Sequence, residues 1–187
     1  MSSSHGKTTT PKYRFLEIIF NMIEKFVRQF EKSKDLPDLF ELVKSAVDET
    51  IHMSRGGLML GLADLGNHPS GFLGAFHPIG TNIIVMNKTP LRRIRETQPE
   101  LWKSYAFHVL LHEYLHTLGY FDEAVVGKKV LEISVLLFGK DHPATQIAAD
   151  TARFFPKLVY PDIAWQPESL HIELVDGFDK SSTGYIA

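Results

Sequence analysis

Apolar residues recur at intervals of three and four positions in two stretches near the start of the chain, with charged or amide residues between them. This spacing places the apolar side chains on one face of a helix, so it predicts an amphipathic helix over residues 13–30. A second helix is predicted to begin at Asp35 and Pro37, which are typical start residues, and to end before Gly56. We therefore expect the first third of the chain to be helical.

Short apolar runs replace this pattern after the second helix. The runs at residues 58–65, 72–76 and 82–86 are bounded by glycine, proline and asparagine, which is typical of strands joined by turns. The segment 76–82 is short enough for a hairpin loop, so the last two strands should be antiparallel. The stretch 82–87 is open to two interpretations: an edge strand that aligns an extended peptide by main-chain pairing, or a plain core strand.

The second half of the chain returns to helical spacing. Proline and glutamate within residues 97–100 are typical of a helix start and Gly119 is a typical stop, so one long helix is predicted between them. Further helices are predicted over residues 122–138 and 143–155. Residues 170–175 alternate between apolar and polar, which indicates a strand.

These elements predict a single α+β domain over residues 12–187, with N-terminal helices, a small mixed sheet and a helical C-terminal half. We find no internal repeat and no long linker that would divide the chain. Residues 1–11 are rich in serine, threonine and lysine and are expected to be a disordered leader. They contain no apolar segment of the kind that secretory signals carry, so we expect a cytoplasmic location.

Composition limits the partners and the chemistry. The formal net charge is -2, so no basic field favours nucleic acid as a partner. The first helix carries too many charges to cross a bilayer, so no membrane partner is expected. The composition does not indicate an oligomeric state. The chain has no cysteine, which excludes disulfides, thiolate nucleophiles and cysteine-containing zinc sites. Any metal ion would have to be held by histidine, aspartate or glutamate.

The long predicted helix carries a His-Glu-Tyr-Leu-His motif at residues 112–116. Because His112 and His116 are four residues apart, their imidazoles lie one turn apart on the same face and can reach one ion. Zinc suits two neutral imidazole nitrogens and a third protein ligand, with a fourth position open for water. Glu113 points in a neighbouring direction, so it is the predicted catalytic base that takes a proton from that water.

Residues 112–122, His-Glu-Tyr-Leu-His-Thr-Leu-Gly-Tyr-Phe-Asp, resemble the HExxHxxGxxD form of the zincin metallopeptidase motif. The resemblance implies a zincin-like fold, one zinc ion, a peptide or protein substrate, a sharp turn at Gly119 and a third ligand at Asp122. The acidic pair Asp122-Glu123 is also similar to that of the minimal zincin-like domains of prokaryotes. Metzincins place a methionine turn after the motif, whereas all five methionines here precede it. We therefore expect a minimal zincin rather than a metzincin.

The third metal ligand is open among three acidic residues. Asp122 is the first choice from the resemblance, although an aspartate directly before a helix is also the favoured N-cap. Glu123 is adjacent and equally acidic. Glu132 would correspond to the ligand that gluzincins take from a following helix, but Lys128 stands four residues earlier and could pair with it on an exposed face.

Other polar residues are candidates for supporting roles. His77 and Tyr120 could donate a hydrogen bond to the oxyanion of a tetrahedral intermediate, although a turn histidine and a packing aromatic residue are the simpler interpretations. His108 lies on the same helix face as the motif. Three histidines along one straight helix span about 12 Å, too far to share one ion, so His108 is expected to be a cleft residue.

The sequence thus predicts a zinc-dependent metallopeptidase that hydrolyses peptide bonds by Glu113-assisted attack of a zinc-bound water. The alternative is a catalytically silent zinc-binding domain that acts as a structural or interaction module. A further hypothesis concerns residues 170–175, where His171 and Glu173 share one side of the predicted strand. This segment could lie over the cleft and hold the enzyme latent.

Overall fold

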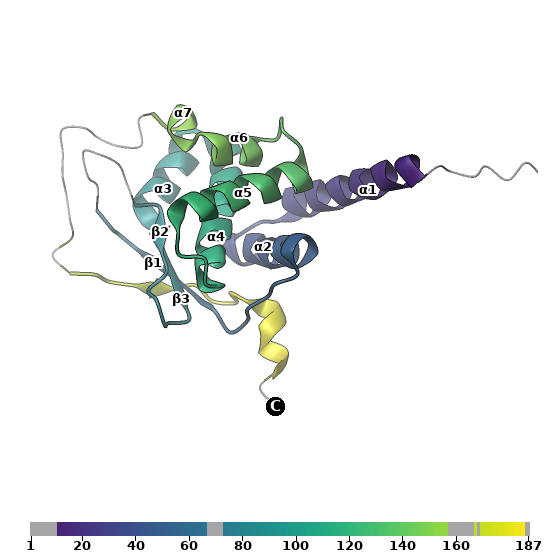
Figure 1. Cartoon of the computed structure of the whole chain (residues 1–187). Coiled ribbons are helices and arrows are strands. Elements are labelled where there is room, and N and C mark those ends of the chain that lie inside the picture. The colour runs from purple at the N-terminus through teal and green to yellow at the C-terminus, as the bar shows by residue number, and fades with distance from the viewer. Residues whose placement is uncertain (1–10, 67–72, 157–166, 168, 186–187) are drawn as a thin grey trace, which may run out of the picture.

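The structure is a computed structural model that describes residues 11–66, 73–156, 167 and 169–185. Across these residues it is a mostly helical α+β fold, with seven α-helices and one mixed sheet of four strands (Figure 1). The predicted leader falls outside the described residues except for Pro11, which begins the first helix. Among the described residues, no helix combines the length and the apolar character that crossing a bilayer requires.

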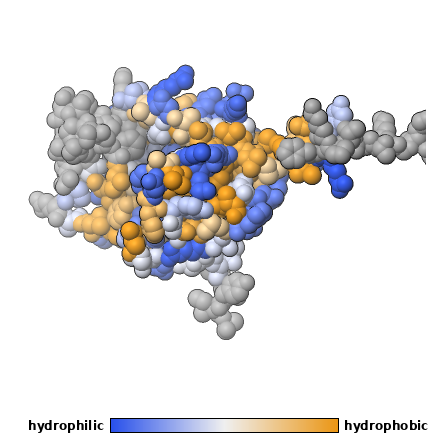
Figure 2. All heavy atoms as spheres, in the orientation of Figure 1, coloured by the Kyte–Doolittle hydropathy of each residue, from blue (hydrophilic) through white to orange (hydrophobic). Residues whose placement is uncertain are grey.

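Both predicted N-terminal helices are confirmed as α1 (Pro11–Lys32) and α2 (Leu36–Ile51). The side chain of Asp35 caps α2 by accepting a hydrogen bond from the main-chain N–H of Asp38. α1 buries Phe26 and Phe30 near its C-terminal end. Its N-terminal turns project from the body of the molecule and carry exposed apolar surface (Figures 1 and 2).

The sheet has the strand order β2-β3-β1-β4. Its strands are β1 (Met59–Ala63), β2 (Ala75–Phe76), β3 (Ile83–Asn87) and β4 (Glu173–Leu174). β2 and β3 are antiparallel, as the hairpin prediction required, whereas β1 and β3 are parallel. β3 lies inside the sheet and is buried, so the edge-strand interpretation of residues 82–87 is wrong and the core-strand interpretation is confirmed.

One helix was not predicted. α3 (Lys88–Thr97) begins directly after β3, where the side chain of Asn87 accepts a hydrogen bond from the N–H of Thr89. This helix buries only Pro90, Leu91 and Ile94, which is too few apolar positions for a clear helical period. A short 3₁₀ turn (Pro99–Leu101) then leads into α4 (Trp102–Thr117), so the long predicted helix starts a few residues late.

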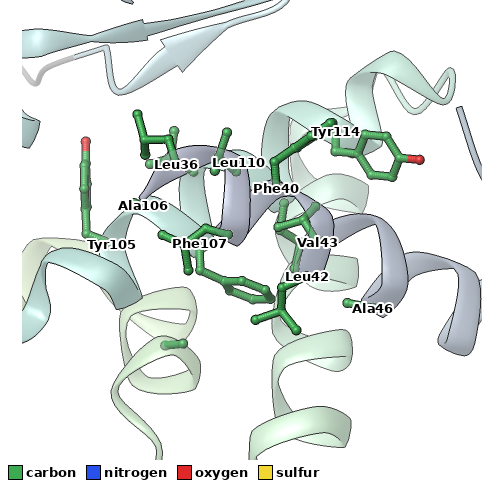
Figure 3. Close-up of a cluster of buried hydrophobic side chains, with 14 of the residues drawn as sticks. Leu36, Phe40, Leu42, Val43, Ala46, Tyr105, Ala106, Phe107, Leu110 and Tyr114 are labelled. Atoms are coloured by element: carbon green, nitrogen blue, oxygen red, sulfur yellow. The ribbon is translucent and has the colours of Figure 1, made fainter. Parts of the chain in front are cut away.

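α4 is the central helix of the fold. It packs against α2, against α5 (Glu123–Phe138) and against α6 (Pro143–Ala149). Figure 3 shows side chains of α2, among them Phe40 and Val43, packed with Phe107 and Leu110 of α4. Because α4 is enclosed on several sides, it is a rigid support for any group that it presents to solvent. The helix predicted over residues 143–155 is divided into α6 and α7 (Thr151–Phe154).

The carboxyl-terminal segment forms one edge of the sheet and then packs on α2. β4 pairs antiparallel with β1 through two residues of the strand predicted over 170–175, and the N–H of the next residue, Val175, donates to the carbonyl of Leu60 at 2.9 Å. Beyond β4, the ring of Phe178 stacks on Phe40 at a centroid distance of 4.0 Å. Asp179 is buried and forms an ion pair with Lys44 of α2. A 3₁₀ helix (Lys180–Tyr185) ends the described chain.

Candidate metal centre

The C-terminal turns of α4 present His112 and His116 on one face, with their Nε2 atoms 3.0 Å apart. Glu123, the first residue of α5, approaches the same point. One carboxylate oxygen lies 3.0 Å from Nε2 of His112 and the other 3.2 Å from Nε2 of His116. One ligand atom from each residue lies within 4.8 Å of the others, so this group of three could hold a metal ion. We call it the His-His-Glu cluster.

The turn between α4 and α5 brings Glu123 onto the two histidines. Gly119 has a φ of 95°, a left-handed conformation that residues with a β-carbon rarely adopt. Its N–H donates to the carbonyl of His116 at 3.0 Å, and the N–H of Tyr120 donates to that of Leu115 at 3.3 Å. These bonds close the end of α4 and reverse the chain. The predicted helix stop at Gly119 is confirmed, and the reversal places the start of α5 beside the cluster.

Asp122 does not lie where the resemblance placed it, as the third metal ligand. It is the N-cap of α5, and its Oδ1 accepts a hydrogen bond of 2.9 Å from the N–H of Val125. The carboxylate of an N-cap folds over the first turn of its own helix, whereas the next side chain points outward from the helix start. The structure therefore brings Glu123, and not Asp122, to His112 and His116.

Two other predicted residues also lie apart from the cluster. Glu132 is exposed on α5, where its carboxylate is 3.8 Å from the ammonium group of Lys128, as the alternative interpretation expected. The hydroxyl of Tyr120 donates to the sulfur of Met53 at 3.3 Å, so it is engaged away from the cluster. The main-chain carbonyl of Tyr120, by contrast, lies 2.7 Å from Nδ1 of His116.

This contact determines which nitrogen of His116 is available to a metal. When Nδ1 carries the proton and donates it to the Tyr120 carbonyl, Nε2 keeps its lone pair and faces the cluster. The pKa of His112 lies below its ordinary value, because burial disfavours the charged ring and His116 repels it, although Glu123 opposes the shift. The neutral form of His112, in which histidine binds metals, is thus favoured.

The donor set fits a first-row transition metal ion. Imidazole nitrogen and carboxylate oxygen are ligands that zinc accepts, and no sulfur is needed. Two nitrogens bound tetrahedrally at about 2.0 to 2.1 Å would be about 3.3 Å apart. The observed separation of 3.0 Å requires only a small adjustment. The absence of cysteine from the chain is therefore compatible with a complete set of three protein ligands.

Glu113 is buried beside the cluster and does not belong to the group of ligands. Burial raises the pKa of its carboxyl group to about 8, and the charge of Glu123 adds to the shift. A carboxyl group with a raised pKa holds a proton more readily than an exposed one. Glu113 is thus placed where it can exchange protons with a molecule bound at the cluster.

Two cavities adjoin at the cluster. The first, of about 350 Å³, extends past His108 to Thr151, and we call it the His108 cavity. The second, of about 260 Å³, extends past Phe121 and Ile79, and we call it the Phe121 cavity. Both are lined by Leu73, Ala75, Glu113 and Glu123, so together they form one groove across the cluster. β2 and the two residues before it, Leu73 and Gly74, line one side of this groove.

The remaining predicted residues lie in these cavities. His77 lines the Phe121 cavity together with Glu113 and His116, and its Nδ1 is 2.8 Å from the carbonyl of Ile83. His108 lines the His108 cavity and lies outside the ligand group, as its distance from His116 along the helix predicted. Burial, together with the charge of His112, lowers the pKa of His108 to about 4.

The structure contradicts one hypothesis about the carboxyl-terminal segment. The groove lies at β2, which is one end of the strand order, whereas β4 is at the other end. The described residues of the segment 170–175 therefore do not lie over the groove. The hypothesis of a latent enzyme covered by this segment is wrong for these residues.

Several groove residues carry no motif in the sequence. Leu73, Ala75 and Thr151 come from segments far apart in the chain, and no spacing rule connects them to the histidines. Glu123 could have been preferred to Asp122 from the N-cap rule alone, because a capping carboxylate is already engaged.

Comparisons of the chain with protein-family models, with curated proteins and with solved structures found no match.

Proposed function

We propose that this chain is a zinc-dependent metallopeptidase with a minimal zincin-like fold. The observation that carries the proposal is the His-His-Glu cluster, which lies next to the buried carboxyl group of Glu113 in an open groove. A site that only stabilises a fold is usually closed by four protein ligands, whereas a catalytic zinc site keeps one position open. Three protein ligands in a groove match the second description.

In this proposal His112, His116 and Glu123 hold one zinc ion. A bound zinc ion supplies a Lewis acid that polarises a carbonyl group and makes water more acidic. Glu113, in its ionised form, takes a proton from the attacking water as the water oxygen bonds to the substrate carbonyl carbon. The same carboxyl group then delivers this proton to the amine nitrogen as the C–N bond breaks.

The groove supports a peptide or protein as the substrate. β2 is the last strand in the sheet order, and β3 is its only strand partner among the described residues. An extended peptide can add to such an edge by main-chain hydrogen bonds and lie across the cluster. His77 remains the candidate oxyanion donor because it lines the same cavity as Glu113 and His116.

Glu113→Gln tests this function in the zinc-loaded protein. We expect one zinc ion per chain in both proteins and at least a 100-fold lower rate of peptide cleavage in the variant, since general acid–base catalysis contributes about 10² to 10⁴. Metal analysis by mass spectrometry and cleavage of a peptide library would measure these quantities. Glu132→Gln is the matched control, because this exposed residue lies apart from the cluster, and it should keep full activity.

A different result would favour the catalytically silent zinc-binding domain. If the zinc-loaded wild-type protein cleaves no peptide or protein in the library, the peptidase proposal fails. The proposal also fails if Glu113→Gln cleaves as fast as the wild type. If neither protein binds zinc, the metal centre itself is refuted.

A further inference from the structure

Three large apolar side chains are exposed together around the Phe121 cavity. Leu73 before β2, Ile79 in the β2–β3 hairpin and Phe121 in the α4–α5 turn have exposed fractions of 51%, 78% and 61%. They come from three separate segments, so no single loop accounts for their exposure. Apolar surface gathered beside polar groups is typical of a site that a ligand covers.

The same cavity contains the groups that the proposed function uses. Glu113, His116 and Glu123 line it together with the three apolar residues. Its volume is about 260 Å³. Pockets for whole small-molecule ligands are about 300 to 1,000 Å³, so this cavity suits a single large side chain rather than a cofactor.

The two ends of the groove differ in chemical character. Apart from His77 and the residues at the cluster, the Phe121 cavity is lined by apolar side chains, including Phe76 at the end of β2. The His108 cavity instead has polar groups of Tyr105, His108 and Thr151 in its lining. The peptide side chains that fit the groove would therefore differ between the two sides of the cluster.

We propose that the Phe121 cavity selects substrates with a bulky apolar side chain on the amino side of the scissile bond. This inference rests on the proposed peptidase function. The substrate class is an extended polypeptide segment that carries leucine, phenylalanine or methionine at this position. Phe121 and Ile79 are the specificity-determining residues, because their exposed side chains would be covered by such a group.

The direction follows from the course of β2 through the groove. Leu73 and Ala75 line both cavities, but Gly74 lines only the His108 cavity, whereas Phe76, His77 and Ile79 line only the Phe121 cavity. A peptide that runs antiparallel to β2 therefore passes from the Phe121 cavity to the His108 cavity. Antiparallel pairing is slightly more stable per residue than parallel pairing. The residue in the Phe121 cavity then precedes the scissile bond.

The zinc-loaded Glu113→Gln variant tests this selectivity without cleavage. Its affinity would be measured by fluorescence polarisation for peptides that differ at one position, with leucine, phenylalanine, alanine or aspartate there. We expect at least 10-fold tighter binding of the leucine and phenylalanine peptides than of the alanine peptide, because a few methylene groups in an apolar pocket discriminate by about 10- to 200-fold. Adding Phe121→Ser or Ile79→Ser should reduce this preference to less than about 3-fold.

Leu174→Ser is the matched control for these substitutions. Leu174 is also 61% exposed, but it lies on β4 at the other edge of the sheet, so the preference should be unchanged. The inference is overturned if the variant binds no peptide, if binding shows no apolar preference, or if the preference survives both substitutions. It is also overturned if Phe121→Ser changes the oligomeric state in light scattering, which would make this surface an interface between copies of the chain.

Cleavage by the zinc-loaded wild-type protein tests the direction. Mass spectrometry of the products should show the apolar residue on the amino side of the cut bond, and enrichment only on the carboxyl side would contradict the proposed direction. If Glu113→Gln binds apolar peptides selectively but the wild type cleaves none of them, the cavity keeps its selectivity and the peptidase function fails.

Discussion

Asp122 and Glu123 are adjacent and equally acidic, yet they have separate tasks. The Asp122 carboxylate accepts the N–H of Val125 and so stabilises the start of α5. The Glu123 carboxylate bridges His112 and His116 at 3.0 and 3.2 Å. The difference arises because the N-cap side chain turns over its own helix while the following side chain is free to point toward α4. Helix stability and metal affinity should therefore respond to different residues of this pair.

Glu123→Gln should lower the affinity for zinc by at least about 100-fold, because an anionic ligand is replaced by a neutral amide. Asp122→Ala should instead lower the free energy of unfolding by about 1 kcal/mol and leave the zinc affinity within a few fold. Asp122→Asn is the control, since asparagine caps helices as well as aspartate does. Competition with a chromogenic chelator and urea denaturation would measure the two effects. Equal loss of zinc affinity in Asp122→Asn and Glu123→Gln would contradict this division.

At the scale of elements, Asn87 connects the strands to the wall of the groove. This buried residue ends β3, and its Oδ1 accepts the N–H of Thr89 at the start of α3. Its Nδ2 donates to the carbonyl of Leu73 at 2.9 Å. One side chain thus joins β3, α3 and the segment that enters β2. The position of Leu73 beside the cluster depends on these hydrogen bonds.

Asn87→Ala should lower the free energy of unfolding by about 2 to 4 kcal/mol, because each buried group left without a partner costs about 1 to 3 kcal/mol. Asn82→Ala is the control. Asn82 is exposed, and its amide donates to the carbonyl of Gly57 at 3.1 Å. Its substitution should cost less than about 1 kcal/mol. Urea denaturation of both variants would measure the difference, and equal losses would show that Asn87 has no special role.

At the scale of the whole molecule, a buried ion pair attaches the carboxyl-terminal segment to the body. Lys44 of α2 pairs with Asp179, and the second oxygen of Asp179 accepts the N–H of Leu58 at 2.9 Å. Burial alone would raise the pKa of Asp179. The hydrogen bonds from Lys44, Ser182 and Leu58 outweigh this effect, so the pKa lies below its ordinary value. The ionised form of Asp179 is therefore favoured in the folded state.

A carboxyl group with a lowered folded-state pKa stabilises the protein above its unfolded pKa, which is about 3.9 for aspartate. This contribution is lost as the pH falls through the folded-state value. Asp179→Ala should therefore lower the free energy of unfolding at pH 7, by about 3 kcal/mol for a broken buried pair, and by less at pH 3. Urea denaturation at both pH values would measure this.

The exposed pair of Asp38 and Lys180, 3.0 Å apart, provides the comparison for Asp179. Asp38→Ala should cost less than about 1 kcal/mol at pH 7, because exposed ion pairs contribute little. A cost for Asp179→Ala that stays the same at pH 3 and pH 7 would contradict the assignment of the pH dependence to this carboxyl group.

The sequence by itself determined the features that depend on neighbouring residues. A spacing of four residues is one helical turn, so it places His112 and His116 together wherever the helix packs. Gly119 likewise ends its helix for a local reason, its positive φ. The hairpin between β2 and β3 also followed from a short segment of turn residues.

Only the tertiary structure decided which acidic residue joins the histidines, how the strands are ordered and what lines the groove. These features depend on where distant segments meet: Lys44 and Asp179 are 135 residues apart, and no periodic pattern relates them. α3 was not predicted because it buries few apolar residues, and their packing contacts form only in the folded chain. Helical spacing is a property of the backbone, whereas contacts between distant segments arise from the packing of the whole core.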